Sequence, residues 1–153
     1  MFHLTELTSY LAASALTCAK QTNGEVSSRL PPSAIIANNV IINDGSLIVA
    51  GVIIQPGTTI GSHCIINTNS NIDHESNINS FSSICPGVTI CGNVNIGELT
   101  FIGANSTIIQ RITIGANCVV GAGTVIIKNV NDNCKIVGNP GRIIQENYHP
   151  LLC

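Results

Sequence analysis

His74 is the residue of this chain best placed for acid–base chemistry, because two carboxylates flank it in Asp73-His74-Glu75. A carboxylate that hydrogen-bonds one imidazole nitrogen fixes the tautomer and raises the basicity of the other nitrogen. Such a pair suits a general base that takes a proton from an amine or a hydroxyl. The other three histidines lie in the tails or in a turn without a neighbouring carboxylate, and we interpret them as ordinary surface side chains.

The elements that position His74 follow from a strict six-residue repeat. Its aliphatic positions are Ile36, Ile42, Ile48, Ile54, Ile60, Ile66, Ile72, Ile78, Ile84, Ile90, Ile96, Ile102, Ile108, Ile114, Val120 and Ile126, without one insertion. The residue two positions before each of them is small or medium-sized, except Ile112. Because residues two apart on a strand share a face, each hexad is expected to turn one large and one small side chain inward.

Turn residues separate these short strands. Glycine directly follows several core positions, and asparagine is abundant between them; both residue types tolerate the left-handed backbone of tight turns. Strands that bend every six residues can wind into a three-sided coil of three hexads per turn. Residues 34–127 then form about five coils, stacked ~4.8 Å apart. The repeat predicts an all-β parallel β-helix; a β-sandwich, the alternative, would have loops of variable length.

The repeat also predicts which residue lies beside His74. Gly92 follows it by one full coil of eighteen residues, so the two are expected to be direct neighbours in the stack. A glycine there lets a backbone N–H approach a developing oxyanion. A general base and an oxyanion donor would therefore meet at one place.

Outside the hexads the pattern changes. We assign residues 1–30 to an N-terminal extension, in which the spacing of Leu4, Leu7, Leu11 and Ala15 predicts a short helix. Residues 31–145 form the β-helix domain and residues 146–153 a tail.

The end of the domain is expected to contain a loop, a strand and a turn. Residues 128–133 are predicted to form the loop, Lys135 to Val137 a last strand, and residues 138–141 a turn.

Composition excludes several classes of protein. The chain has 153 residues, of which 9% are charged and 44% hydrophobic, unlike a disordered segment. A net charge of −2 without a basic stripe argues against nucleic-acid binding, and no apolar run is long enough to span a membrane. Seven cysteines without CxxC spacing, and no signal peptide with a basic start, predict a cytoplasmic protein with unpaired thiols.

Several motifs extend from Asn67 to Ile144, about half of the chain. They are Asp73-His74-Glu75, Cys85-Pro86-Gly87-Val88, Cys91-Gly92-Asn93-Val94, Val120-Gly121-Ala122-Gly123 and Val137-Gly138-Asn139-Pro140-Gly141-Arg142. In order and spacing this stretch resembles the hexapeptide sugar acetyltransferases, especially the sialic-acid O-acetyltransferase and nucleotide-amino-sugar N-acetyltransferase group. The resemblance implies a left-handed β-helix and a homotrimer.

The resemblance also implies an activity and roles for individual residues. His74 would be the catalytic base for direct attack of a sugar or nucleotide-sugar amine or hydroxyl on acetyl-CoA, with Glu75 orienting its ring. Gly92 would contact the acetyl carbonyl. The CoA would run between two subunits, and no metal is implied. The residues expected along its pantetheine arm and adenine are Gly92, Gly121, Ala122, Gly138, Asn139 and Pro140.

In two respects the sequence departs from the family. Ser83 stands where many members have a second histidine near the thioester; its hydroxyl could still donate a hydrogen bond to the acetyl group. Only about thirty residues precede the repeats, so we expect no nucleotide-sugar-binding domain before the β-helix. The identity of the acceptor, and the choice between nitrogen and oxygen, stay open.

Two other functions remain as alternatives. A catalytically inactive trimeric scaffold or binding module would keep the coil without binding CoA. A zinc carbonic anhydrase would need three converging histidines, whereas His63 and His74 occupy different positions within their hexads.

Overall fold

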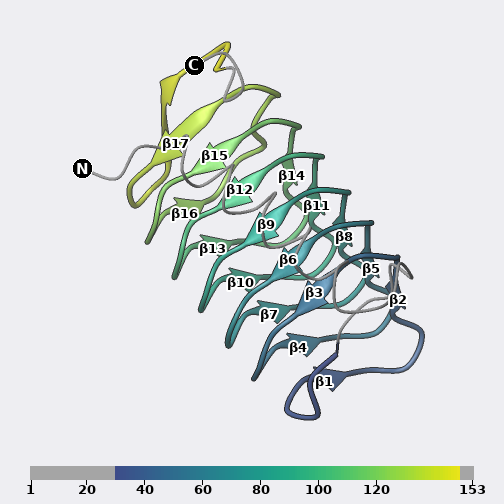
Figure 1. Cartoon of the computed structure of the whole chain (residues 1–153). Helices are drawn as coiled ribbons and strands as arrows, with labels where there is room; N and C mark the ends of the chain where they lie inside the picture. The colour runs from purple at the N-terminus through teal and green to yellow at the C-terminus, as the bar shows by residue number, and fades with distance from the viewer. Residues whose placement is uncertain (1–29, 149–153) are drawn as a thin grey trace.

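The computed structural model describes residues 30–148, and every regular element in this range is a β-strand. The strands stack along one axis as the turns of a solenoid, from the first coil at one end to the C-terminal strands at the other (Figure 1). No helix in residues 30–148 is long and apolar enough to cross a membrane. The helix predicted around Leu4 to Ala15 lies outside the described residues.

Three sheets form the sides of the solenoid, and each takes every third strand of the repeat. The β1 sheet contains β1 (Ile35–Ile36), β4 (Ile53–Ile54), β7 (Asn71–Ile72), β10 (Thr89–Ile90), β13 (Thr107–Ile108) and β16 (Val125–Ile126). The β2 sheet contains β2 (Ile41–Ile42), β5 (Thr59–Ile60), β8 (Asn77–Ile78), β11 (Asn95–Ile96) and β14 (Thr113–Ile114). The β3 sheet contains β3 (Leu47–Ile48), β6 (Ile65–Ile66), β9 (Ser83–Ile84), β12 (Phe101–Ile102), β15 (Val119–Val120), β17 (Lys135–Val137) and β18 (Arg142–Gln145).

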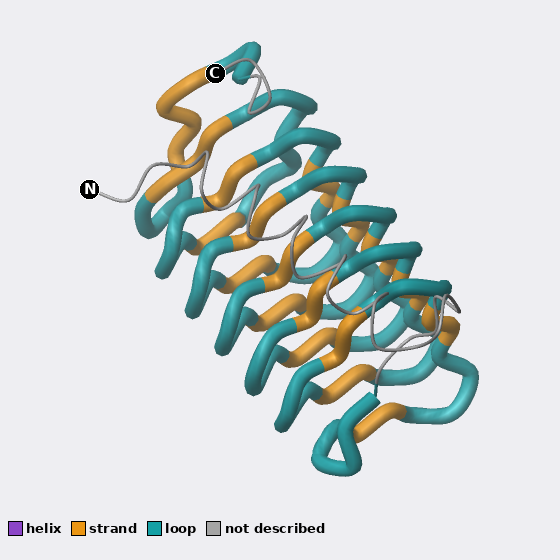
Figure 2. Tube along the Cα trace, in the orientation of Figure 1, coloured by secondary structure: helices purple, strands orange, loops and turns teal. Residues whose placement is uncertain are grey.

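The register between coils is the eighteen-residue step expected from the sequence. Ile54 pairs with Ile72, and Ile72 with Ile90, in parallel. Figure 2 shows short strands alternating with turns along the whole described chain. The predicted parallel β-helix is therefore confirmed, and the β-sandwich is excluded.

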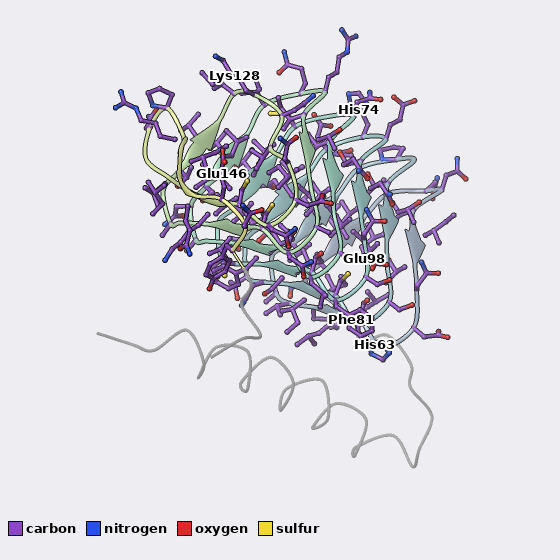
Figure 3. The ribbon with its side chains drawn as sticks, turned by 90° about the horizontal axis from the view of Figure 1, so that it is seen from above. His63, His74, Phe81, Glu98, Lys128 and Glu146 are labelled. Atoms are coloured by element: carbon purple, nitrogen blue, oxygen red, sulfur yellow. The ribbon has the colours of Figure 1, made fainter. Side chains whose placement is uncertain are left out.

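Turns join the sheets at three corners, which we name after one residue of each. The His74 corner leads from the β1 sheet to the β2 sheet, the His63 corner from the β2 sheet to the β3 sheet, and the Gly121 corner from the β3 sheet back to the β1 sheet. In Figure 3 His74 lies on one edge of the solenoid, and His63, Phe81 and Glu98 lie on the opposite edge.

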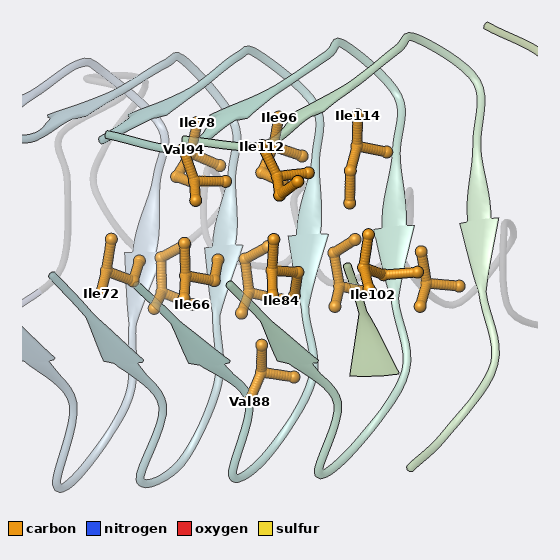
Figure 4. Close-up of a cluster of buried hydrophobic side chains, with 14 of the residues drawn as sticks. Ile66, Ile72, Ile78, Ile84, Val88, Val94, Ile96, Ile102, Ile112 and Ile114 are labelled. Carbon is orange, nitrogen blue, oxygen red and sulfur yellow. The ribbon is translucent and has the colours of Figure 1, made fainter. Parts of the chain in front are cut away.

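The aliphatic column fills the centre of the solenoid. Its members from Ile48 to Ile126 are at most 2% exposed, and they stack one above another (Figure 4). The smaller inward residues are also buried, and their hydroxyls find partners: Ser46 Oγ donates to the Gly61 carbonyl at 2.7 Å and accepts from the Cys64 amide at 2.9 Å. Because these polar groups are satisfied, their burial does not incur the cost of an unpaired hydroxyl.

The C-terminal end extends the coil further than predicted. Six strands in the β1 sheet make about six turns rather than five. The segment 128–133 is not simply a loop, because Val130 is buried and bridges Ile114 in parallel. The step from Ile114 to Val130 spans sixteen residues rather than eighteen. The repeat therefore continues with two residues fewer, and a strict six-residue period does not detect it. The predicted strand Lys135–Val137 and the turn at 138–141 are confirmed; the antiparallel strand β18 was not predicted.

Candidate active site

The turn that carries His74 lies between β7 and β8 and is fixed from both neighbouring coils. The Asp73 carboxylate accepts a hydrogen bond from the His74 amide at 2.8 Å. The Glu75 amide donates to the Pro56 carbonyl of the preceding coil at 3.0 Å, and the His74 carbonyl accepts from the Asn93 amide of the next coil at 2.9 Å. The backbone of the turn is therefore held on both sides, and the side chains of His74 and Glu75 are exposed to solvent.

His74 and Glu75 form the pair expected from the sequence. His74 Nδ1 lies 3.5 Å from Glu75 Oε2, with the two side chains 53% and 66% exposed. Asn93 Nδ2 donates to the same carboxylate oxygen at 3.0 Å and so ties Glu75 to the next coil. With Nδ1 facing a carboxylate, Nε2 is the ring nitrogen left to accept a proton. Asn93 was not predicted for this role, although it follows Glu75 by one coil, which is the signal that would have identified it.

Gly92 lies against the His74 ring. A β-carbon built on Gly92 would stand 2.5 Å from His74 Nε2 and 2.6 Å from Cε1. Any other residue would therefore displace the imidazole. Gly92 is buried, and within residues 30–148 no acceptor bonds its amide. The structure thus brings His74, Glu75 and Gly92 together.

Ser83 lies elsewhere in the chain. It is the outward residue of β9 in the β3 sheet, between Ile65 and Phe101, and it is only 6% exposed. The His74 corner joins the other two sheets, so one chain does not bring the Ser83 hydroxyl to the imidazole.

Five of the six residues expected along CoA gather at the Gly121 corner, whereas the sixth, Gly92, lies at the His74 corner. The Gly121 amide donates to the Ile136 carbonyl at 2.8 Å, and a β-carbon on Gly121 would meet Val137 Cγ1 at 2.9 Å. The turn at 138–141 packs onto the same corner, because the Gly138 carbonyl accepts from Val125 and the Gly141 amide donates back to the Val125 carbonyl. Gly121, Ala122, Gly138, Asn139 and Pro140 therefore form one surface, separated from His74 by the width of the β1 sheet.

His63 differs from His74 in its surroundings. Its ring stacks on Phe81 of the next coil, with centroids 5.2 Å apart and planes at 16°. No carboxylate pairs with it among the described residues.

The described cysteines are unpaired, and three of them, Cys64, Cys118 and Cys134, are buried. Burial raises the pKa of the Cys85 thiol to about 11, so this group stays protonated at neutral pH. Residues 30–148 contain no cluster of three His, Cys, Asp or Glu side chains that could hold a metal ion.

Comparisons with known proteins agree with this architecture. Residues 93–128 match the sequence profile of the family described as bacterial transferase hexapeptide (six repeats). The chain is a hexapeptide-repeat β-helix. A search of curated protein sequences found no match for this hexapeptide-repeat chain.

Solved structures similar to the hexapeptide-repeat chain include acetyltransferases. A variant of perosamine N-acetyltransferase from Caulobacter crescentus, in complex with CoA and GDP-perosamine, is 28% identical over 90% of this chain with a TM-score of 0.81. The acetyltransferase domain of PglB from Neisseria gonorrhoeae, in complex with acetyl coenzyme A, is 29% identical over 84% of this chain with a TM-score of 0.79. WeeI from Acinetobacter baumannii is 25% identical over 89%, also with a TM-score of 0.79. The chain spans 65% and 63% of the lengths of the first two, which is less than two thirds.

Proposed function

We propose that this protein transfers the acetyl group of acetyl-CoA to an amino group of a sugar, carried on a nucleotide. The observation that carries the proposal is the absence of a side chain at Gly92, directly against the Nε2 edge of His74. A base and an unpaired backbone donor at one point are what attack of an amine on a thioester requires.

The reaction we infer forms a C–N bond, breaks the C–S bond and moves one proton from nitrogen to sulfur. The acceptor amine attacks the thioester carbonyl, and His74 Nε2 takes the proton that the nitrogen loses. The Gly92 N–H stabilises the oxyanion; the intermediate then collapses, the C–S bond breaks, and the CoA thiolate receives the proton from His74. A positioned base contributes about 10²–10⁴-fold and one oxyanion donor about 10²–10³-fold.

Glu75 and Asn93 are positioning residues in this proposal. The Glu75 carboxylate faces Nδ1 at 3.5 Å and stabilises the imidazolium formed during transfer, and Asn93 fixes that carboxylate. Both side chains are too exposed for a large contribution, because solvent screens their charges.

The nature of the acceptor is inferred from the similar structures. The first of them holds GDP-perosamine, and its name specifies N-acetylation. We therefore favour an amine over a hydroxyl and a nucleotide-linked amino sugar over a free one.

We also propose that the complete site forms between subunits of a trimer. The surface around Gly121 and Pro140 and the His74 corner lie on opposite edges of the β1 sheet of one chain. Closed symmetry would bring the Gly121 corner of one subunit to the His74 corner of another. Ser83 would reach a thioester only from a neighbouring subunit.

The test is thiol release from acetyl-CoA with a panel of UDP-, dTDP- and GDP-linked amino sugars and free sialic acids. We expect release with an amino sugar, lost about 10²-fold or more in His74→Ala. His63→Ala is the matched control, because it removes a turn imidazole of the same solenoid at another corner. Full activity of His74→Ala would refute the site, and no release with any acceptor from a folded trimer would favour the inactive scaffold.

A further inference from the structure

The left-handed turn positions differ between the three corners. Each corner repeats one such position every coil, and Gly or Asn is the relaxed residue there because other side chains incur about 1 kcal/mol or more. At the Gly121 corner the coils carry only Gly51, Asn69, Gly87, Asn105 and Gly123. At the His74 corner two coils depart from this rule, with Glu75 at φ 55° and Arg111 at φ 60°.

Glu75 already has an explanation, since it pairs with His74. No contact among residues 30–148 gives Arg111 such an explanation. The only ion pair in residues 30–148 joins His74 and Glu75, so Arg111 is exposed without a carboxylate partner. At the His63 corner the corresponding position holds His63, Phe81 and Leu99, so the left-handed backbone alone does not single out Arg111; its exposed, unpaired charge does.

The cationic residues are also unevenly distributed along the solenoid. Residues 30–110 contain no Lys or Arg, whereas residues 111–142 contain Arg111, Lys128, Lys135 and Arg142. Two of the four, Arg111 and Lys128, stand on the His74 corner. In the other direction from His74 the same corner carries Pro56, Gly57 and Asn39, none of them cationic.

Arg111 and Lys128 continue the line from His74 through Gly92. The Arg111 amide donates to the Gly92 carbonyl at 3.0 Å, which places it in the next coil. Lys128 occupies the coil after that, in the turn from β16 to the bridge at Val130. Figure 3 shows Lys128 on the same edge of the molecule as His74.

The distances of Arg111 and Lys128 from Gly92 match the distance between the sulfur and the pyrophosphate of CoA. An extended pantetheine arm of about fourteen bonds separates sulfur from pyrophosphate by ~17 Å. With coils ~4.8 Å apart, Arg111 and Lys128 begin about 5 and about 10 Å beyond Gly92, and their side chains add roughly 6 Å. The two cations therefore reach the region where a thioester held at Gly92 would place its phosphates.

We propose that Arg111 and Lys128 bind the phosphate groups of the CoA donor and so restrict the enzyme to nucleotide-linked thioesters. This inference rests on the proposed acetyl transfer. Arg111 presents a planar fork that can hold a phosphate through two N–H donors, and Lys128 acts as a point charge.

The first experiment measures binding of CoA, dephospho-CoA and pantetheine by calorimetry. Single charges are removed in Arg111→Gln and Lys128→Gln, with Lys135→Gln as the matched control, because Lys135 lies in the β3 sheet against the Tyr148 ring. We expect the wild type to bind CoA most tightly, each test variant to bind it about tenfold more weakly, and the control to match the wild type. Unchanged CoA affinity in both test variants would overturn the inference.

A kinetic experiment separates this inference from the proposed function. Acetyl transfer is compared with acetyl-CoA and with S-acetylpantetheine, which has no phosphate. Arg111→Gln and Lys128→Gln should raise KM for acetyl-CoA about tenfold and leave kcat/KM for S-acetylpantetheine unchanged. Equal losses with both donors would mean a general structural effect and would refute phosphate recognition. If the wild type neither binds CoA nor uses either donor, the proposed function and the inference both fail.

Discussion

Two histidines stand in turns of the same solenoid, and the next coil makes them different. His63 has Phe81 beside it, and the two rings stack at 5.2 Å. His74 has Gly92 at the corresponding distance along the axis and Glu75 on its other side. One face of the His63 ring is thus covered by an aromatic neighbour, whereas His74 has no side chain beside Nε2 at Gly92 and a carboxylate facing Nδ1.

The comparison shows that the surroundings of a turn residue depend strongly on the residue eighteen positions later, which is its neighbour in the next coil. Part of the distinction lies in the turns themselves, because a carboxylate pairs with His74 and none pairs with His63 among residues 30–148. The rest lies in the residue one coil later, which either covers the ring, as Phe81 does, or leaves the space beside it empty, as Gly92 does.

The largest expected effect separates the two imidazoles directly. His74→Ala should lower kcat/KM for acetyl transfer about 10²–10⁴-fold, because no other base lies at Gly92. His63→Ala should retain activity within about twofold. The measurement is thiol release over a range of acetyl-CoA concentrations at saturating acceptor, and comparable losses in the two variants would contradict the prediction.

The second prediction fills the space beside His74. Gly92→Ala would place a β-carbon 2.5 Å from Nε2, so the ring must move, and activity should fall about 10²-fold. The melting temperature should change little because the obstructing group is a half-exposed side chain. The contrasting variant is Gly45→Ala at the His63 corner, where φ is 76°; it should lose about 1 kcal/mol of stability and keep its activity. Gly92→Ala with full activity would contradict the arrangement.

A smaller effect is expected from the carboxylate that distinguishes His74 from His63. Glu75→Gln keeps the shape and removes the charge, and it should reduce kcat about threefold to tenfold, since the pair is exposed. Asn93→Ala should give part of the same loss without adding to it, because it acts through Glu75. Additive losses in the double variant would show that the two residues act independently.

The smallest effect concerns the stacked pair. Phe81 occupies a left-handed position with φ 61° and is 56% exposed. In Phe81→Asn the lost stacking and the relieved backbone strain oppose each other, so the free energy of unfolding should change by less than about 1 kcal/mol. Chemical denaturation measures this change, and acetyl transfer should be unaffected. A decrease of several kcal/mol in the free energy of unfolding would mean that the stacked pair is needed for the stability of the solenoid.

Much of the fold was predictable because one spacing determines it. The column from Ile36 to Ile126 predicts the strands, their register and the neighbour of His74, since stacked coils convert sequence distance into contact. The loop predicted at residues 128–133 contains no strand, but it includes a bridge that was not predicted, because the step shortens by two residues and Val130 still enters the core. A search for a strict six-residue period does not detect a coil that is two residues shorter.

The candidate site was predictable only in part. His74, Glu75 and Gly92 share one corner and follow from the eighteen-residue step. Asn93 follows from the same step but was interpreted as an ordinary turn residue, because asparagine is common in left-handed turns. The distance of Ser83 from His74 depends on which sheet each hexad joins, and that follows only from counting hexads around the coil.

The antiparallel strand β18 has a consequence for how the molecule behaves in concentrated solution. A parallel solenoid ends in strands whose amides and carbonyls could template another chain, and end-to-end growth is the hazard of such edges. β18 pairs with β17 in the opposite direction, with an irregularity between Lys135 and Ile136. A further coil could not continue the parallel ladder across that strand. On this side of the prism, β18 therefore acts as a stop against fibre-like polymerisation and gives the stack a defined length.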